Sequence, residues 1–259
     1  MDVRLDYGRS GLLVRVPDTL AVSLLEPHKG VPLDDPSAAI EHALADPVVS
    51  APLSDLARGR RNAAVVISDK TRPVPYGILL PPILRILEAA GLRPDHIEIL
   101  VATGLHRPNT RDELCEMTSP AIVDRYRIRN HVARNADEHV HLGRTLRGTE
   151  VWIDGGFVAA DLKIVTGLIE PHLMAGYSGG RKAICPGLCA AETIMAWHSP
   201  QMLEPPEVRA GNLRGSSLKR SRETSGHSLL FGNSLRPRPR QLRLRGGAYW
   251  RGSPSARGW

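Results

Sequence analysis

The sequence predicts an α/β fold in which a Rossmann-like parallel sheet carries ligand-binding loops at the carboxyl ends of its strands. Three observations predict it. Short apolar runs recur along the chain, segments with helical spacing separate them, and a polar loop rich in turn residues follows each run directly. Strands that alternate with helices are typical of parallel sheets covered by helices on both faces.

Three apolar runs predict buried strands: residues 63–68, 97–102 and 162–166. The first run is partly β-branched and follows a polar turn at residues 58–62, the second follows a break at Gly91 and Pro94, and the third follows Asp161. Runs of this length between turn residues are typical of strands buried on both faces. We expect all three in one parallel sheet.

Three segments predict helices: residues 76–90, 110–117 and 190–197. The first has apolar side chains at helical spacing, and we expect Pro81 and Pro82 to shorten or kink its start. Thr110 and Glu113 have the spacing of a capping box, which opens the second helix. The third follows a Pro-Gly break in the sequence.

The loops directly after the three strands are polar and marked by proline or glycine; they span residues 69–75, 103–108 and 167–172. In open α/β sheets, ligands bind at the carboxyl ends of the strands. We therefore expect these three loops to converge at one edge of the sheet and to form the ligand site.

Charge divides the 259 residues into two parts. Eleven Lys and Arg against one acidic residue give residues 214–259 a charge of +10, and residues 1–213 carry −3, so the net charge of +7 describes neither part. Hydrophobic content of 42% with only 4% aromatic residues predicts an aliphatic core. We expect one domain over residues 1–213 and a disordered Arg/Gly/Ser/Pro-rich basic tail over residues 214–259.

Composition also excludes several classes of protein. No stretch approaches the roughly 20 apolar residues of a membrane helix, and the N-terminus lacks the basic and apolar regions of a signal peptide. Cys115, Cys185 and Cys189 have neither zinc-type spacing nor the pattern of a disulfide framework. These observations predict a cytoplasmic protein without a membrane partner.

Two of the loops carry side chains that suit a ligand site. Arg72 offers a planar fork that pairs with a carboxylate or a phosphate, and Asp69 can accept hydrogen bonds. A local ion pair between the two that shapes the proline-rich turn explains them equally well. His106 follows Gly104, which permits a tight turn, and would face either a ligand or only solvent.

Residues 167–200 have the most specific pattern of the chain. Glycines let backbone amides approach a phosphate, a lysine adds a charge or a nucleophilic amine, and neutral imidazoles suit nickel, copper or zinc. The residues of these types are Gly176, Gly179, Gly180, Lys182, His172 and His198. The spacing differs from that of a P-loop, and we expect Cys185 and Cys189 in the core.

Three motifs, in order, resemble the nickel-dependent lactate racemase family, often called LarA-like. They read SDKTRPVP at residues 68–75, ATGLHRP at 102–108 and GLIEPHLMAGYSGGRKAICPGLCAAETIMAWHSP at 167–200. The resemblance runs from near the N-terminus to about Leu213. Members of the family continue into a second α/β domain, so the resemblance implies that this second domain is missing here.

The resemblance implies a cofactor. It is a nickel-pincer nucleotide (pyridinium-3,5-bisthiocarboxylic acid mononucleotide nickel), covalently joined to Lys182 in this chain, with His198 as the nickel ligand. Asp69, Gly179 and Gly180 match positions that line the cofactor.

The resemblance also implies the reaction, which is racemisation or epimerisation of lactate or a related 2-hydroxy acid. Arg72 matches the residue that holds the substrate carboxylate, and His106 and His172 match the pair that takes and returns the hydroxyl proton. Imidazoles with a pKa near neutrality suit this task. The hydrogen on C2 moves as hydride, which is the chemistry of the cofactor and not of the protein.

Two classes of function follow. The first is an enzyme impaired by loss of the second domain, with a small 2-hydroxy acid and the cofactor maturation enzymes as partners. The second is a non-catalytic remnant, or a nucleic-acid-binding module that contacts phosphates through the basic tail. The tail lacks spaced aromatics and any nucleic-acid-binding motif, so we do not expect nucleic acid as a partner. The abrupt change near Arg214 indicates a reading-frame shift.

Overall fold

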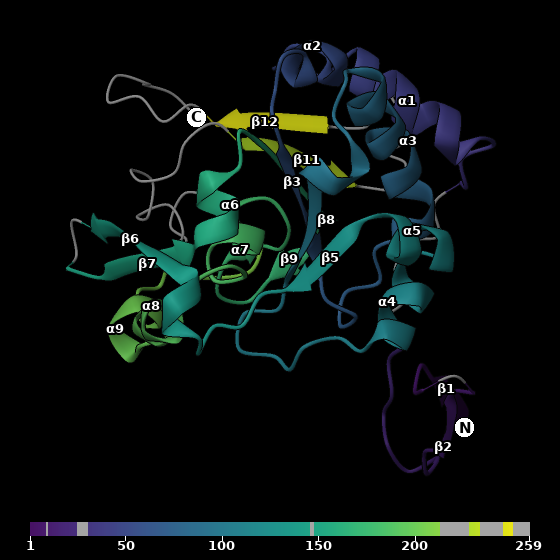
Figure 1. Cartoon of the computed structure of the whole chain (residues 1–259). Coiled ribbons are helices and arrows are strands. Elements are labelled where there is room, and N and C mark those ends of the chain that lie inside the picture. Colours follow the sequence, from purple (N-terminus) through teal and green to yellow (C-terminus); the bar gives the residue numbers. More distant parts are fainter. Residues whose placement is uncertain (9, 25–30, 146–147, 213–227, 234–245, 251–259) are drawn as a thin grey trace. The chain divides into compact units, whose positions relative to one another are not determined.

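Figure 1 shows the computed structural model of the chain, which describes residues 1–8, 10–24, 31–145, 148–212, 228–233 and 246–250. Its contacts divide into two compact units, Met1–Val31 and Pro32–Trp259. In the first unit, β1 (Asp2–Leu5) and β2 (Leu12–Arg15) form an antiparallel hairpin. Arg15 Nε lies 3.1 Å from Asp2 Oδ1 across this hairpin.

The second unit is organised by a parallel sheet. At its centre β3 (Ala63–Ser68) lies between β4 (Ile97–Ala102) and β8 (Leu162–Leu168), parallel to both, and β5 (Arg127–Asn130) continues the sheet beyond β4. The predicted parallel sheet is confirmed. The first two strands have the predicted bounds, and β8 is two residues longer than the predicted 162–166.

Two segments of the basic tail are described, and both are strands of this sheet. β11 (Ser228–Asn233) pairs in parallel with β8, and β12 (Gly246–Trp250) pairs antiparallel with β11. Among the described residues, the strand order is therefore β12-β11-β8-β3-β4-β5. The rest of residues 214–259 lies outside the described residues, so the disorder of the tail as a whole stays a prediction.

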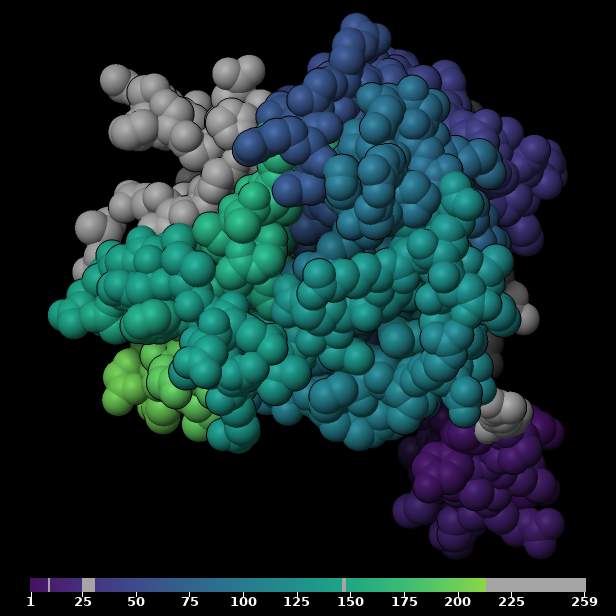
Figure 2. Space-filling view, in the orientation of Figure 1, coloured from purple at the N-terminus to yellow at the C-terminus, as the bar shows by residue number. Residues whose placement is uncertain are grey.

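Helices cover the two faces of the sheet (Figure 1). Alternate residues of a strand point to opposite faces, and in β3 Val65 and Ile67 join one apolar core while Ala64 and Val66 join another. The first core contains residues from α1 (Pro36–Ala45), α2 (Leu53–Ala57), α3 (Tyr76–Ala89), α4 (Arg111–Met117) and α5 (Pro120–Arg125). The second contains residues from α6 (Gly155–Ala159), α7 (Arg181–Ile184) and α8 (Ala191–Trp197). In the space-filling view, side chains fill most of the space between these ribbons on the face shown (Figure 2).

The three predicted helices are present. α3 begins at Tyr76 with Pro81 and Pro82 inside it, so the proline pair does not shorten the helix. Complete burial of Leu80 and Ile83 offsets the backbone hydrogen bonds that the two prolines cannot donate. The capping box at the start of α4 is formed as expected, and α8 begins one residue after its predicted start. Among the described residues, no helix combines the length and the apolar composition that crossing a bilayer requires.

Shorter elements complete the second unit and were not predicted. Two antiparallel pairs lie outside the main sheet: β6 (His139–Arg144) with β7 (Glu150–Asp154), and β9 (Pro171–His172) with β10 (Gly176–Tyr177). The remaining short helices are α9 (Pro200–Leu203) and the 3-10 turns Pro94–His96 and Ala136–Glu138.

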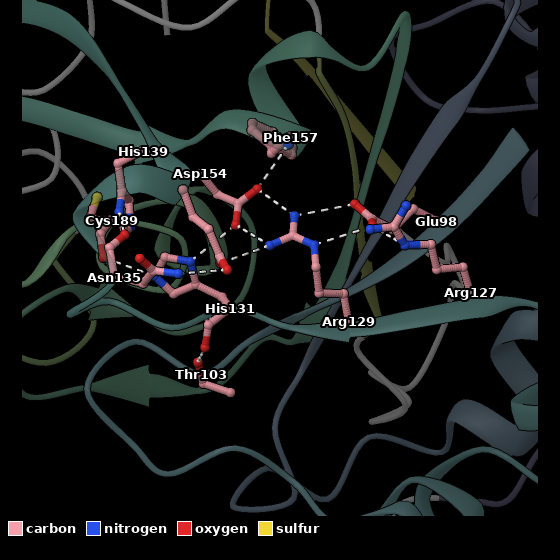
Figure 3. Close-up of polar contacts among 11 residues, drawn as sticks. Glu98, Thr103, Arg127, Arg129, His131, Asn135, His139, Asp154, Phe157 and Cys189 are labelled. Atoms are coloured by element: carbon pink, nitrogen blue, oxygen red, sulfur yellow. Dashed lines mark hydrogen bonds and ion pairs between the residues drawn. The ribbon is translucent and has the colours of Figure 1, made fainter.

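A buried ion pair joins Arg129 on β5 to Asp154 at the end of β7 (Figure 3). Arg129 Nη1 and Nη2 donate to the two Asp154 oxygens at 2.9 and 2.7 Å, and its Nε and Nη2 each lie 3.2 Å from a Glu98 oxygen. Asp154 is fully buried and also contacts His131 Nδ1 at 3.2 Å. Burial raises the pKa of the Asp154 carboxyl, but hydrogen bonds from His131 and Arg129 outweigh burial and hold this pKa well below its usual range.

Two further contacts fix the position of this network. A Cβ added to Gly156 would lie 2.6 Å from Arg129 Nη2, so only glycine at this position leaves room for the guanidinium. His131 Nε2 lies 2.9 Å from the carbonyl oxygen of Cys189. The network therefore extends from the sheet to the segment between α7 and α8.

Asp154→Asn is expected to lower the free energy of unfolding by about 1–3 kcal/mol, because it removes the fully buried carboxylate that Arg129 contacts most closely, while Glu98 remains beside the guanidinium. Urea denaturation followed by tryptophan fluorescence measures this change. Asp95→Asn is the matched control, since Asp95 forms an exposed ion pair with Arg93 and should contribute far less. Equal losses in the two variants would contradict the importance of the buried pair.

Candidate functional site

Four of the predicted site residues follow the ends of three neighbouring strands. Asp69 and Arg72 follow β3, His106 follows β4, and His172 follows β8. Because β3 lies between β4 and β8 and all three are parallel, their carboxyl ends meet at one edge of the sheet. The three loops therefore begin side by side, as the sequence predicted.

Asp69 and His106 are in direct contact. His106 Nδ1 lies 2.6 Å from Asp69 Oδ2, and the other carboxylate oxygen accepts a hydrogen bond from Thr71 Oγ1 at 2.6 Å. The Asp69 side chain is buried, whereas that of His106 is 60% exposed. Arg72 has a different partner, with its Nη1 2.9 Å from Glu170 Oε1. The two residues that the sequence suggested as a local ion pair thus each bind a residue from another loop.

The carboxylate of Glu113 ties two of the site loops together. It accepts from Lys70 Nζ at 2.7 Å and from Arg107 Nη1 and Nη2 at 2.8 and 2.6 Å. It also accepts from the Thr110 amide at 2.9 Å as part of the capping box. Hydrogen bonds from Arg107 and then Lys70 hold the pKa of Glu113 well below its usual range, so the link is present at neutral pH.

A turn of two glycines places Lys182. Gly179 and Gly180 have φ of 68° and 52°, in the left-handed region that favours glycine. A Cβ on Gly179 would lie 2.8 Å from the Leu168 carbonyl oxygen, and a Cβ on Gly167 would lie 3.2 Å from Gly179 Cα. The turn therefore packs directly against the end of β8, and the Lys182 amide donates to the Gly179 carbonyl at 3.0 Å.

The surroundings of Lys182 disfavour the charged form of its amino group. Burial lowers the pKa of Lys182 most, and the charge of Arg72 lowers it further, while Asp69 and Glu170 oppose the shift. A lower pKa increases the fraction of neutral amine, which is the nucleophilic form. These charge effects show that Lys182 lies near the loops that follow β3 and β8.

Both histidines that flank this turn in the sequence are held neutral. Burial first, then the charges of Lys182 and Arg72 and the neighbouring His198 lower the pKa of His172 to about 4. Burial also lowers the pKa of His198; contact with the Ile194 backbone opposes this, and Lys182 adds to it. Neutral imidazole is the form that ligates a metal or accepts a proton.

These interactions connect the residues that the sequence singled out. Electrostatic effects join Lys182 to Arg72, His172 and His198, and also to Asp69, which is bonded to His106. The residues brought together are Asp69, Arg72, His106, His172, Lys182 and His198, with the Gly179-Gly180 turn beside Lys182. Their roles stay predictions.

Both cysteines near this site belong to the core, as expected. Cys189 is fully buried among apolar side chains, and Cys185 packs against the same cluster. A hydrogen bond with Cys185, together with burial, raises the pKa of the Cys189 thiol, so it stays protonated. Across the described part of the chain, no group of three or more His, Cys, Asp or Glu side chains could hold a metal ion.

A cavity of about 580 Å³ lies at the other edge of the sheet, at the amino ends of β3 and β4. Charged side chains line it, among them Glu98, Arg127 and Arg129. None of the predicted site residues line this cavity. In open α/β sheets the carboxyl ends of the strands bind ligands, so we place the candidate site there and not in this cavity.

Glu170 and Glu113 are the site residues that the sequence analysis missed. Glu170 lies inside the quoted 167–200 motif, two residues before His172, and an acid at the end of a strand was the available signal. Glu113 was read only as a helix cap. Its second role depends on Lys70 and Arg107, which no local pattern connects to it.

A parallel α/β sheet whose strand ends gather a largely buried lysine, an arginine and neutral imidazoles is an arrangement that suits anionic ligands and acid–base chemistry. Residues 7–211 match the family described as the lactate racemase N-terminal domain. The match covers well over half of the chain, and the chain therefore belongs to the lactate racemase family.

Two lactate racemases are similar in sequence. That of Lactiplantibacillus plantarum is 42% identical over 180 residues, which are 69% of this chain and 42% of the relative. That of Thermoanaerobacterium thermosaccharolyticum is 32% identical over 222 residues, which are 85% of this chain and 52% of the relative. The chain thus spans about half the length of the curated relatives that it matches.

Solved structures agree with this assignment. The lactate racemase apoprotein from Thermoanaerobacterium thermosaccharolyticum superposes with a TM-score of 0.71 at 31% identity, covering 85% of this chain and 51% of that one. A protein from Thermotoga maritima superposes with a TM-score of 0.61 at 18% identity, covering 82% of this chain and 54% of that one. The second likeness shows the fold alone.

The charge of Lys182 should be visible in the titration of His172. Lys182→Met is expected to raise the pKa of His172 from about 4 toward 6.5, since it removes the cation whose charge lowers this pKa most. Burial remains, so the rise should be partial. Histidine ring signals followed by NMR through a pH titration measure it. Lys163→Met, a matched change on the same strand as the site but at its amino end, should leave the His172 titration unchanged.

The lowered pKa of His172 also determines the direction in which stability changes with pH. The native pKa of His172 lies below the ordinary 6.5, so the unfolded chain binds the proton first as the pH falls. The contribution of neutral His172 to stability is therefore present above about pH 6.5 and is lost progressively toward pH 4. A His172 pKa at or above 6.5 in the unmodified chain would contradict the buried, cation-flanked position.

Proposed function

We propose that this chain carries the cofactor-binding and catalytic residues of an isomerase that racemises or epimerises lactate or a related 2-hydroxy acid. The observation that carries the proposal is the electrostatic cluster of Lys182, Arg72, His172 and His198 in a member of the lactate racemase family. Its cations suit a carboxylate and a phosphate, and its neutral imidazoles suit proton transfer and metal binding.

The chemistry of the side chains fits a nickel-pincer nucleotide. Lys182, with its lowered pKa, offers a neutral amine for covalent attachment, and His198 offers a neutral imidazole for nickel. One protein imidazole does not complete the coordination of a nickel ion, and in the described part of the chain no group of three or more His, Cys, Asp or Glu side chains could hold one. The sulfur arms of the nucleotide would supply the remaining donors.

Gly179 and Gly180 would let the backbone approach the nucleotide, since neither has a side chain and both adopt positive φ. Asp69 would line the cofactor from the opposite loop. When bound, the cofactor supplies a hydride acceptor for the hydrogen on C2 of the substrate.

The chain's own residues would orient the substrate and move its proton. Arg72 would bind the substrate carboxylate, and Glu170, 2.9 Å away, would hold the guanidinium in place. His106 and His172, on loops from two strands beside β3, would handle the hydroxyl proton. Fixing the carboxylate and the hydroxyl at once restricts the rotation of C2 and so contributes to rate through orientation.

Turnover also needs exclusion of water from the site. The chain matches only about half the length of its relatives. We therefore expect little or no turnover from the 259-residue chain by itself. We expect activity from an extended version, in which the chain is joined to the part of a lactate racemase relative that lies outside the matched region.

The test is production of both versions together with the enzymes that mature the cofactor, followed by chiral analysis of lactate and related 2-hydroxy acids. The extended version should interconvert the enantiomers. His198→Ala should reduce bound nickel by at least ~10- to 100-fold. Loss of a residue that only hydrogen-bonds to a metal ligand already has an effect of this size. Lys182→Ala should abolish the mass increase of the covalent cofactor.

His96→Ala and Lys163→Ala are the matched controls, because neither residue contacts the candidate site. Elemental analysis for nickel and intact-protein mass spectrometry provide the readouts. Absence of nickel from both matured versions would refute the cofactor assignment. Robust turnover by the 259-residue chain would refute the expected need for the remaining region.

A further inference from the structure

The loops that follow β3 and β4 both begin with a tight turn. In the first loop the Arg72 amide donates to the Asp69 carbonyl oxygen at 3.1 Å. In the second the His106 amide donates to the Thr103 carbonyl oxygen at 3.0 Å. A hydrogen bond between residues three positions apart closes a β-turn, so each loop holds its own shape. Neither of these bonds fixes one turn relative to the other.

Two links join the turns to each other. The inner link is the contact of 2.6 Å between Asp69 Oδ2 and His106 Nδ1. The outer link uses the next residue of each loop. Lys70 Nζ donates to the Glu113 carboxylate at 2.7 Å, and Arg107 donates to both of its oxygens at 2.6 and 2.8 Å. Because adjacent residues form the two links, the turns are held together at two places.

Glu113 is itself held in place. It lies in the first turn of α4, where its amide donates to Thr110 Oγ1 at 3.3 Å and its carboxylate accepts from the Thr110 amide at 2.9 Å. Its side chain is only 12% exposed. A single exposed ion pair contributes little, but a bidentate arginine within a network of several charges does stabilise. The outer link therefore restrains both loops, in addition to capping the helix.

We propose that Glu113 is a positioning residue of the candidate site, because its carboxylate fixes the turn that ends at Arg72 against the turn that ends at His106. This inference rests on the proposed function, in which both turns carry residues of one site. Glu113 acts through Lys70 and Arg107 and takes no part in the chemical step.

Two variants separate the cap from the link. Glu113→Gln keeps a side chain that caps a helix at this position, but it loses the charge and one of the two acceptor oxygens that Arg107 binds. Thr110→Ala removes the hydroxyl that caps α4. It leaves the carboxylate of Glu113 with Lys70, Arg107 and the backbone amide of residue 110.

Amide hydrogen exchange followed by NMR tests the link in the 259-residue chain without cofactor. In Glu113→Gln the amides of Arg72 and His106 should exchange faster than in the unmodified chain, while the amides of α4 keep their protection. Thr110→Ala should show the reverse pattern. Unchanged exchange at the two turn amides in Glu113→Gln, or an equal change in both variants, would overturn the inference.

Arg107→Lys is a second test of the same link. Lysine keeps the charge but lacks the planar fork that binds both oxygens, so the same two turn amides should again exchange faster. This variant decides the question if Glu113→Gln does not fold. Exchange as slow as in the unmodified chain would count against the outer link.

Activity of the extended, matured version gives a further readout. Glu113→Gln should reduce kcat by up to about 10²-fold, the cost of a misplacement of about 1 Å, while Thr110→Ala should leave kcat nearly unchanged. Bound nickel and cofactor mass should be equal in the two variants, so that a loss of kcat reflects the position of the loops. Equal kcat values in the two variants would contradict the positioning role. Absence of nickel or of racemisation in the unmodified extended protein would instead refute the proposed function and leave the exchange result standing.

Discussion

The packing of the second unit depends on one fully buried negative charge, the carboxylate of Asp154, which the partly buried guanidinium of Arg129 neutralises. The acidic partners of Arg129 come from β4 and from the end of β7 (Figure 3), and we expect loss of the β7 partner to cost about 1–3 kcal/mol. The hairpin of β6 and β7 therefore cannot separate from the sheet without leaving a charge unpaired. Through His131 and the carbonyl of Cys189, the same network restrains the segment that follows Lys182.

The candidate site shows the opposite balance of charge. Arg72 and Lys182 lie close together, while the nearby acids Asp69 and Glu170 already bind other groups of the site. Burial lowers the pKa values of Lys182 and His172 most, and positive charge that is only partly neutralised there lowers them further. A bound anion would relieve this repulsion, and both the carboxylate of a 2-hydroxy acid and the phosphate of a nucleotide are anions. The electrostatics support the proposed ligands without identifying them.

Local patterns predicted much of the fold and less of the site. The apolar strands β3 and β4 and the capping box could be predicted, because each depends on neighbours in the sequence. β5, with the sequence RIRN, could not, since its two arginines are accommodated by Glu98 on the next strand and, for Arg129, also by Asp154 at the end of β7. The site loops were predicted by motif, but the contact of Asp69 with His106 spans 37 residues. It depends on the register that pairs Ser68 with Ala102, which no local pattern reveals.

The close approach of Gly167 and Gly179 has a consequence for how this family can evolve. Gly167 lies one residue before the end of β8, and Gly179 begins the turn before Lys182. A Cβ on Gly167 would lie 3.2 Å from Gly179 Cα, and a Cβ on Gly179 would lie 2.8 Å from the Leu168 carbonyl oxygen. Neither position can acquire a side chain unless the segment that carries the other one moves. A substitution at either position should therefore displace the other segment, so that the strand end and the turn that carries Lys182 move together.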